Sequence, residues 1–463
     1  MFRKIELWIL LLVILFGFLG TIFFGWLVAN NINSFQPRFP ALSNAANELV
    51  RLPNNLRRLV SAGDLLASSN RYGSLSGFIG EPNSDSSYLL LSRYDGDLRE
   101  GVVELVDLKD FSVMHTWNPD IDYFNSLVND GTKEEFKNIN RDIPNNRARL
   151  MHPILDRDGA LIFATEFGYL AKIDSCSKKI WIKDDDIYHH SIELDAEGNI
   201  WTPTHFSPKT VPISKVGSTF NDDGIVKTSK DGKILFRKSL TQIFIENNLE
   251  YLLFQIGTHK FNVDPLHLND IQPVNYDGEF WKKGDIFLSI RNQSMGMLYR
   301  PDTNDVIWVG VGHTNSQHDI DIIDNNTISM FNNNYKSLVY GSVVEGNNEV
   351  VLYDFEKKEY SSYLSESLVR EDVRTPTGGR SEIISNGDLF IDEEEYGRLI
   401  YFSKDGSTKW QFVNSDSLGN VYTIAWSRIL YQQQDVENVD NFLSGLTECE
   451  QNNVKTRSDL YGD

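Results

Sequence analysis

Four histidines stand at comparable points in a chain that has only nine. Each precedes a short β-prone run and a turn rich in Asp, Asn or Gly, and the four are His152, His190, His267 and His318. Imidazole is the side chain whose ordinary pKa lies near neutrality, so it can serve as nucleophile, general acid or general base. If these positions are equivalent in the fold, we expect the four rings to converge on one site.

His318 lies in the most informative stretch of the chain. Residues 312–321 read GHTNSQHDID and separate the β-prone run 306–310 from the run 327–331. This order predicts that His318 stands at the entry to a strand, directly after a polar loop. Side chains at the end of a sheet, next to loops, are often the functional ones. We therefore take His318 as the centre of the candidate site.

The body of the chain repeats a unit of four short strands separated by acidic or Gly-containing turns. The clearest copies are residues 151–182 and 381–413, and others begin near residues 87, 190, 267 and 318. Such units are typical of propeller blades, which need neighbours to bury both faces. We expect an all-β fold, a six-bladed β-propeller, as the catalytic domain over residues 84–432. A late strand within residues 421–431 would complete the first blade or cap the ring. A parallel β-helix is the alternative.

The N-terminus carries a segment of a different kind. Residues 7–28 are uncharged and apolar, and about 20 such residues suffice to cross a bilayer. A cleaved signal has a shorter apolar core and a small-residue cleavage site. We therefore expect residues 1–29 to be an uncleaved single-pass anchor, 30–83 a stalk or lead-in, and 433–463 a polar tail. The catalytic domain is expected on the periplasmic or extracellular side.

Composition excludes several classes of protein. The formal net charge is −21 and the body has no basic patch, which argues against a nucleic-acid partner. Two cysteines cannot form a disulfide framework or a usual Cys-based zinc site. Whether Cys176 and Cys449 pair stays open, as does the formation of a homodimer.

Five short motifs occur in a fixed order between residues 184 and 334. They are His190-Ser191-Ile192 before an Asp195–Gly198-Asn199 turn, His267-Leu268-Asn269, Ser289-Ile290-Arg291, Ile307-Trp308-Val309-Gly310 and Gln317-His318-Asp319. In this order they resemble the arylsulfotransferase (arylsulfate sulfotransferase) family. Beyond this region the chain resembles the family only in its pattern of short strands separated by turns. The closely spaced cysteine pair of some members and their N-terminal β-sandwich have no counterpart here.

The resemblance implies a six-bladed propeller that moves a sulfuryl group from an aryl sulfate to a phenolic or other hydroxyl acceptor. No nucleotide donor and no cofactor are implied. His318 corresponds to the nucleophile, which forms a covalent sulfohistidine in a ping-pong reaction. His190, His267, Asn269 and Arg291 correspond to the residues that hold the sulfuryl oxygens. His190 and His267 could instead be the acid and the base, and their roles stay unassigned.

The chemistry of these residue types agrees with that reading. Sulfuryl transfer resembles phosphoryl transfer, in which positioning and stabilisation of negative charge dominate. Arg291 offers a planar fork of donors for an oxyanion. An Arg and an Asn beside the histidines suit an anion better than a cation, so no metal is expected.

Three further expectations concern the surroundings of the site. Because side chains alternate along a strand, we expect His189 to point away from His190. Residues 184–186, three aspartates, are expected to form a solvated turn, and residues 375–380 a polar loop at the sixth unit. Two other functions stay open. One is a non-catalytic propeller that binds or scaffolds, and the other is a sulfate-ester hydrolase.

Overall fold

The computed structural model describes residues 6–33, 39, 41–43, 45–46, 49–50, 66–128, 143–217, 219–254, 261–338 and 341–446. The chain divides into two compact units. The smaller comprises Met1–Leu65 with Gly257–Phe261, and the larger comprises Leu66–Ile256 with Asn262–Asp463.

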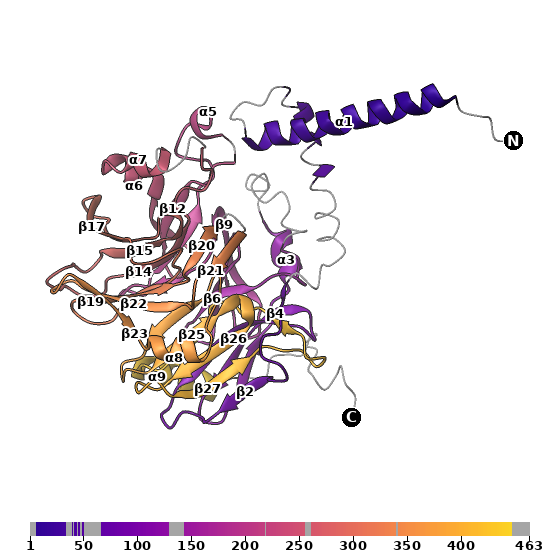
Figure 1. Cartoon of the computed structure of the whole chain (residues 1–463). Coiled ribbons are helices and arrows are strands. Elements are labelled where there is room, and N and C mark those ends of the chain that lie inside the picture. Colours follow the sequence, from indigo (N-terminus) through magenta and orange to yellow (C-terminus); the bar gives the residue numbers. More distant parts are fainter. Residues whose placement is uncertain are drawn as a thin grey trace. The chain divides into compact units, whose positions relative to one another are not determined.

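Helix α1 (Leu7–Asn33) is the long element of the smaller unit, drawn in indigo in Figure 1. Its segment Leu7–Ala29 has a mean hydropathy of 2.7, and nearly all of its large apolar side chains are exposed, with Leu27 as the buried exception. A helix of 23 residues rises about 35 Å, enough for the hydrocarbon core of a bilayer. By length and composition this helix can cross a membrane once.

The larger unit is built from antiparallel sheets. The chain's late strand β29 (Arg428–Leu430) opens the first sheet, whose other strands follow in order. They are β3 (Tyr88–Asp95), β4 (Glu100–Asp107) and β5 (Ser112–Trp117). The next sheet has eight strands. They are β6 (Leu150–Leu155), β7 (Leu161–Thr165), β8 (Gly168–Ile173), β9 (Lys179–Tyr188), β10 (Glu193–Leu194), β11 (Ile200–His205), β12 (Asp223–Thr228) and β13 (Ile234–Ser239).

Two four-stranded sheets follow. The strands of one are β14 (Leu268–Pro273), β15 (Ile286–Ile290), β16 (Met295–Arg300) and β17 (Asp305–Val311). The strands of the other are β18 (Ile320–Ile322), β19 (Thr327–Asn332), β22 (Glu349–Asp354) and β23 (Glu359–Tyr363). The hairpin β20 (Tyr335–Leu338) and β21 (Gly341–Val344) is inserted in the latter.

The last large sheet has five strands, and strand β2 forms its outer edge. They are β2 (Gly77–Gly80), β27 (Thr408–Val413), β26 (Arg398–Phe402), β25 (Leu389–Glu393) and β24 (Arg380–Ile383). A small pair joins β1 (Ala67–Ser68) to β28 (Val421–Tyr422). The described helical segments of this unit are α3 (Ile121–Ser126), α5 (Ile213–Val216), α6 (Leu240–Glu246), α7 (Glu250–Phe254), α8 (Ser365–Arg370), α9 (Gln433–Gly445), η2 (Arg291–Gln293) and η3 (Glu394–Tyr396).

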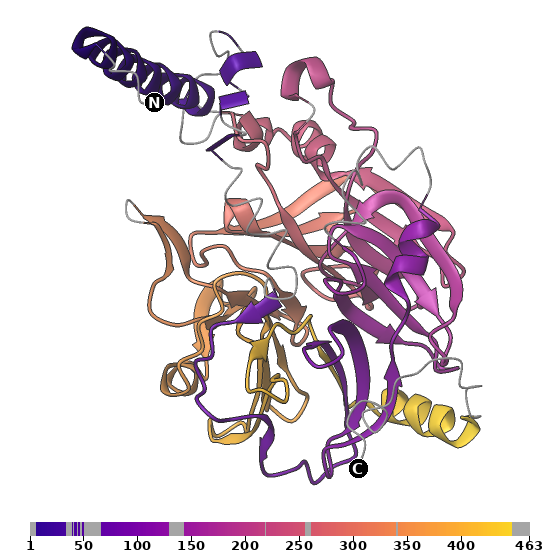
Figure 2. The same ribbon diagram turned by 90° about the vertical axis from the view of Figure 1, so that its right-hand side faces the viewer.

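The two ends of this unit are joined by strand pairing. Near the C-terminus, Ile429 of β29 pairs with Leu89 of β3, and near the N-terminus, Phe78 of β2 pairs with Phe412 of β27. Figure 1 and Figure 2 show the purple N-terminal strands beside the yellow C-terminal ones. The fold is therefore all-β and propeller-like. The predicted closure by a late strand is confirmed, and β2 extends the sheets into the predicted lead-in.

Side chains that point alternately to the two faces of a sheet explain how one sheet packs between two others. In β3, Leu89 and Leu91 pack with Phe390 and Trp410 of the last sheet. Leu90, between them, packs in the cluster that includes residues of β7 and β8. Successive side chains of a strand point to opposite faces, so β3 serves both cores. Burial of both faces is what a propeller blade requires.

Two predicted surface segments lie in regular structure instead. Residues 184–186 lie in β9 rather than in a turn, and Asp186 is fully buried against Arg237, with 2.6 Å between Oδ1 and Nη2. The predicted polar tail begins with α9, whose Val439 and Phe442 are buried beside Trp117. Residues 447–463 lie outside the described range.

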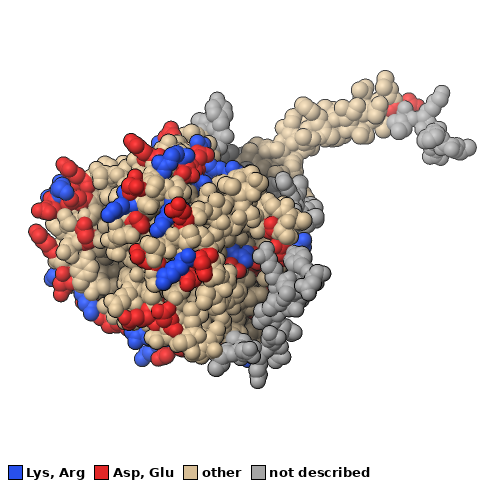
Figure 3. All heavy atoms as spheres, turned by 90° about the horizontal axis from the view of Figure 1, so that it is seen from below, with Lys and Arg blue, Asp and Glu red and all other residues tan. Residues whose placement is uncertain are grey.

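Charged side chains of both signs are interspersed on the face shown in Figure 3, where they form no large basic patch. Cys176 is disulfide-bonded, and Cys449 lies outside the described residues.

Candidate active site

Three of the predicted histidines lie together in the larger unit. The ring centroid of His190 is 5.4 Å from that of His267 and 6.0 Å from that of His318. His190 follows β9, His267 immediately precedes β14, and His318 precedes β18. Three sheets thus contribute one imidazole each. The repeated histidine positions predicted four converging rings, and three of the four converge.

His190 and His267 have a left-handed backbone, with φ of 56° and 58°. This conformation costs a residue other than glycine about 1–3 kcal/mol and clusters at functional sites. Surrounding hydrogen bonds hold it. The N–H of His267 donates to Oδ2 of Asp223 at 3.0 Å, and the N–H of Arg291 donates to the carbonyl of His267 at 3.0 Å.

The left-handed turn at His190 also overturns the expectation for His189. Alternation applies to a regular strand, but β9 ends at Tyr188. Nδ1 of His189 therefore lies 2.7 Å from Nδ1 of His190, and one ring donates its proton to the other. His189 contacts His190 directly rather than pointing away from it.

The environment of His318 selects one tautomer of its ring. Nδ1 lies 2.7 Å from Oδ1 of Asn333. The amide nitrogen of Asn333 donates to the carbonyls of Thr375 and Gly378, so its oxygen must accept. Nδ1 of His318 therefore carries the proton and Nε2 carries the lone pair. The N–H of Gly378 donates to that Nε2 at 2.9 Å. The polar loop 375–380 thus covers His318.

The imidazoles of His318 and His190 are neutral near pH 7. Burial lowers the pKa of His318 to about 3, and the positive charge of Arg291 adds to this effect. Burial also lowers the pKa of His190 well below its ordinary value, helped by His267 and His318. A neutral ring with a lone pair on Nε2 is the nucleophilic form of histidine.

Arg291 supplies positive charge beside these rings. It is half-buried in η2, and Nη1 donates to Oδ1 of Asn292 at 2.9 Å. Among the described residues no carboxylate lies within ion-pair distance of its guanidinium. Burial lowers the pKa of Arg291. A cation without a paired carboxylate, close to neutral imidazoles, is suited to an anionic ligand.

Asn269 contacts the segment that carries His318. It is fully buried, and its Nδ2 donates to the carbonyl of Gln317 at 3.2 Å. Its Oδ1 has no hydrogen-bond partner among the described groups. Asn269 therefore anchors the residue directly before His318.

His267 is backed by a carboxylate. Its Nδ1 lies 2.7 Å from Oδ2 of Asp264. The carboxylate can only accept, so Nδ1 of His267 carries a proton and Nε2 is left to exchange one. A His–Asp pair of this kind orients an acid–base imidazole.

Aromatic rings enclose the cluster. Trp426 is fully buried, and its centroid lies 6.0 Å from that of His190 and 6.4 Å from that of His318. Its Nε1 donates to Oε2 of Glu394 at 2.7 Å. His152, the fourth predicted histidine, contacts Trp426 and lies 2.7 Å from Nη2 of Arg428. Of the described imidazoles, none makes ring contact with His152, so the prediction that His152 converges with the other three rings is wrong.

Residues 156–415, more than half of the chain, match the family of arylsulfotransferases (ASST). The chain belongs to the arylsulfotransferase family. The matched range includes every imidazole of the cluster, together with Arg291, Asn269 and Asn333. It ends before Trp426, which lies beside the histidine cluster and comes from the C-terminal part of the larger unit.

No curated protein matches the chain. A protein of unknown function from Bacteroides caccae aligns with a TM-score of 0.44 at 10% identity, covering 74% of this chain and 98% of its own. The WD40 β-propeller domain of Doa1 aligns with a TM-score of 0.37 at 11% identity, covering 80% of this chain and 98% of its own.

Proposed function

We propose that the chain transfers a sulfuryl group from an aryl sulfate ester to a phenolic or other hydroxyl acceptor, by way of a sulfohistidine at His318. The observation that carries this proposal is the state of His318. Its ring is neutral and buried, its tautomer is set by Asn333, and its centroid lies 6.0 Å from that of His190, with the charge of Arg291 acting on it. Membership of the arylsulfotransferase family supports the reaction class at the family level.

In the first step, Nε2 of His318 attacks the sulfur of the donor. The N–S bond forms as the S–O bond to the aryl group breaks, and the phenol leaves after taking up a proton. Arg291 balances the negative charge of the sulfuryl oxygens. Asn269 acts less directly, because its amide nitrogen holds the loop in front of His318.

In the second step, the hydroxyl oxygen of the acceptor attacks the sulfur and the N–S bond breaks. A base must take the hydroxyl proton. His267 is suited to this role because Asp264 lies 2.7 Å from its Nδ1 and stabilises the protonated ring. The same pair can donate that proton in the first step. We therefore assign acid–base chemistry to His267 and oxyanion binding to His190.

The loop over His318 must move before attack. In the free protein the Gly378 N–H occupies the lone pair of Nε2. When a sulfuryl group takes that position, the freed N–H becomes a donor for one of its oxygens.

We further infer six blades, because the eight-stranded sheet divides between β9 and β11 into two successive four-stranded units. The domain boundaries follow from this count, with the blades occupying about the predicted range 84–432 plus β2. We place them on the periplasmic or extracellular side of the membrane. The disulfide-bonded Cys176 supports this placement, because disulfides persist in oxidising compartments.

The test uses the full-length protein in detergent, because truncation at residue 84 would remove β2. Nitrophenol release from 4-nitrophenyl sulfate is measured with and without phenol, together with the fate of the sulfuryl group. Phenol-stimulated release with formation of phenyl sulfate, lost in His318→Ala, supports the transferase. Free sulfate as the product would instead indicate a hydrolase. No release from several aryl sulfates would favour a binding protein.

A further inference from the structure

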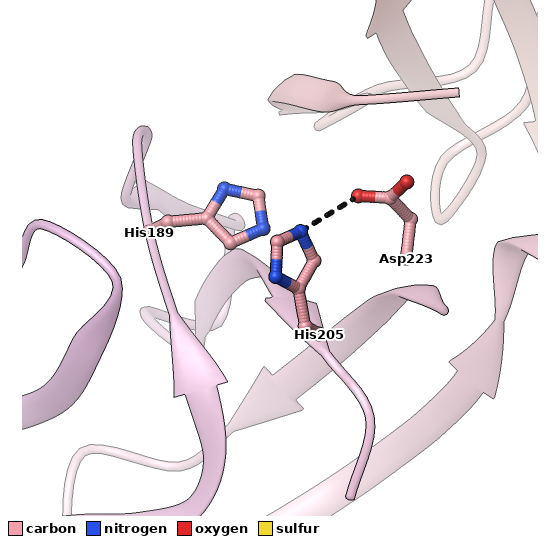
Figure 4. Close-up of side chains that lie close together, drawn as sticks. All are labelled: His189, His205 and Asp223. Atoms are coloured by element: carbon pink, nitrogen blue, oxygen red, sulfur yellow. Dashed lines mark ion pairs between the residues drawn. The ribbon is translucent and has the colours of Figure 1, made fainter. Parts of the chain in front are cut away.

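We propose that His189, His205 and Asp223 bind a divalent transition-metal ion of the zinc type, next to the histidine cluster. One potential ligand atom of each residue lies within 4.8 Å of the other two. Figure 4 shows His205 between the other two side chains, with its Nε2 3.4 Å from Oδ1 of Asp223. None of these residues is needed as nucleophile or oxyanion ligand in the proposed reaction.

Three neighbouring strands present the three side chains at one end of a sheet. His205 ends β11, and Asp223 begins β12 directly opposite it in the register. His189 follows the last residue of β9, the strand on the other side of β11. Directly opposed residues of an antiparallel pair lie close enough for their side chains to meet. The positions are thus set by regular sheet structure, which suits a preformed binding site.

The Nε2 atoms of His189 and His205 face this centre (Figure 4). Nε2 of His189 and Nε2 of His205 are buried, and neither has a hydrogen-bond partner in the described part of the chain. A buried polar atom without a partner costs about 1–3 kcal/mol. The two atoms belong to adjacent side chains and converge beside a buried carboxylate. A bound cation would satisfy both nitrogens and the carboxylate together.

The surroundings resemble the outer shell of a metal site. Both carboxylate oxygens of Asp223 accept backbone N–H groups, from His267 at 3.0 Å and from Leu268 at 3.3 Å. Carboxylate ligands are commonly held this way, since each oxygen keeps a further lone pair. The ring of Phe167 stacks on both imidazoles, 5.2 Å from His189 and 5.7 Å from His205. The ring orientations are therefore restrained.

The ligand set indicates the kind of ion. Two imidazoles and one carboxylate suit zinc and its neighbours, whereas calcium and magnesium prefer oxygen ligands. Tetrahedral zinc holds its ligand atoms roughly 3.4 Å apart, from Zn–N bonds of about 2.0–2.1 Å. The side chains therefore need only a small inward movement. A fourth position stays open for water.

The consequence for His190 rests on the proposed function. Metal at Nε2 of His189 leaves the proton on Nδ1, so that Nδ1–H must donate to Nδ1 of His190, 2.7 Å away. His190 then carries its own proton on Nε2. A ring in this tautomer is a hydrogen-bond donor for a sulfuryl oxygen. The ion would thus position His190 without touching the substrate.

The binding test needs no activity. Full-length protein is stripped with chelator, loaded with Zn²⁺, desalted and assayed for bound metal. We expect stoichiometric zinc in the wild type, and an affinity lower by more than about 100-fold in His205→Gln, because even changes to groups outside the ligand set cost about 10–100-fold. The matched control His313→Gln changes a histidine that stacks on Tyr360, away from these residues, and should bind zinc like the wild type. In case His205→Gln folds poorly, X-ray absorption of wild type loaded with Co²⁺ should show two imidazole ligands.

Wild type without retained zinc, or His205→Gln with unchanged affinity, would overturn the metal site. A Co²⁺ spectrum without imidazole ligation would overturn it as well. The outcome is separate from that of the transferase. A protein that binds zinc but releases no phenol from aryl sulfates would keep the metal site while the proposed reaction fails.

Discussion

The backbone N–H of Gly378 lies 2.9 Å from Nε2 of His318, the nitrogen that carries the ring's lone pair. Gly378 has a φ of +62°, and a Cβ at this position would collide with the carboxylate of Glu394. That carboxylate is itself held by Nε1 of Trp426. Only glycine therefore lets this loop lie on His318.

Replacing Gly378 by alanine should displace the loop. We expect Gly378→Ala to lower the free energy of unfolding by about 1–3 kcal/mol, through backbone strain and the clash with Glu394. The rate of sulfuryl transfer should fall about tenfold or more, since loss of a donor near a developing oxyanion has such effects. Thermal unfolding and nitrophenol release measure the two.

The matched control is Gly346→Ala. Gly346 has a φ of +76°, but no atom lies within 4 Å of its would-be Cβ. Gly346→Ala should lower the free energy of unfolding through backbone strain alone and keep the wild-type rate of sulfuryl transfer. If both variants behave alike, the contact of Gly378 with His318 has no role in transfer.

Asn333 should control the tautomer of His318. In Asn333→Ala the proton of the ring is free to move to Nε2, and the buried Nδ1 of His318 loses its partner, which costs about 1–3 kcal/mol. We expect the rate of sulfohistidine formation to fall about 10–100-fold. Asn348→Ala is the control, because Asn348 donates to the carbonyls of Asn333 and Thr375 but not to His318. If the rate of sulfohistidine formation falls equally in the two variants, the effect comes from the loop 375–380 and not from the tautomer of His318.

The pH dependence of the first step should show no acid limb near the ordinary pKa of histidine. Burial lowers the pKa of His318 from 6.5 to about 3, so the ring stays neutral as the pH falls through 6.5. 4-Nitrophenyl sulfate is the right probe, because its leaving group needs little acid catalysis. The burst rate should therefore stay level between about pH 5 and pH 8. A limb near pH 6.5 that tracks His318 would contradict the neutral, buried ring.

Arg291 should contribute through the geometry of its guanidinium as well as its charge. Arg291→Lys keeps a positive charge but loses the planar fork, so we expect kcat/KM for aryl sulfates to fall about 10–100-fold. Arg300→Lys is a matched change in an ion pair with Asp285 outside the histidine cluster, and it should leave kcat/KM unchanged. A wild-type value for Arg291→Lys would remove Arg291 from oxyanion binding.

The sequence alone indicated much of the site, because its residues recur with the fold. His190, His267 and His318 precede successive groups of strands, so the repeat itself placed them together. Arg291 follows a strand within one of these units. The position of each residue relative to its neighbouring strand can be read from the sequence without knowing the tertiary structure.

Residues that do not stand at this repeated position could not be assigned to the site from the sequence. Asn333 stands directly after β19, and its role depends on a side-chain hydrogen bond to His318. Trp426 arrives through the segment that closes the ring. His189 was misplaced because the left-handed φ of His190 breaks the alternation that regular strands obey. The role of β2 was missed because its pairing partner, β27, lies more than 300 residues later.

The most direct test of the account is the covalent state of His318 after reaction with donor alone. Full-length protein is mixed with 4-nitrophenyl sulfate without acceptor, and its peptides are analysed by mass spectrometry at alkaline pH. We expect one added sulfuryl group on the His318 peptide, removed by addition of phenol and absent in His318→Ala. A protein that turns over aryl sulfate while His318 stays unmodified, or with the sulfuryl group on another residue, would contradict it.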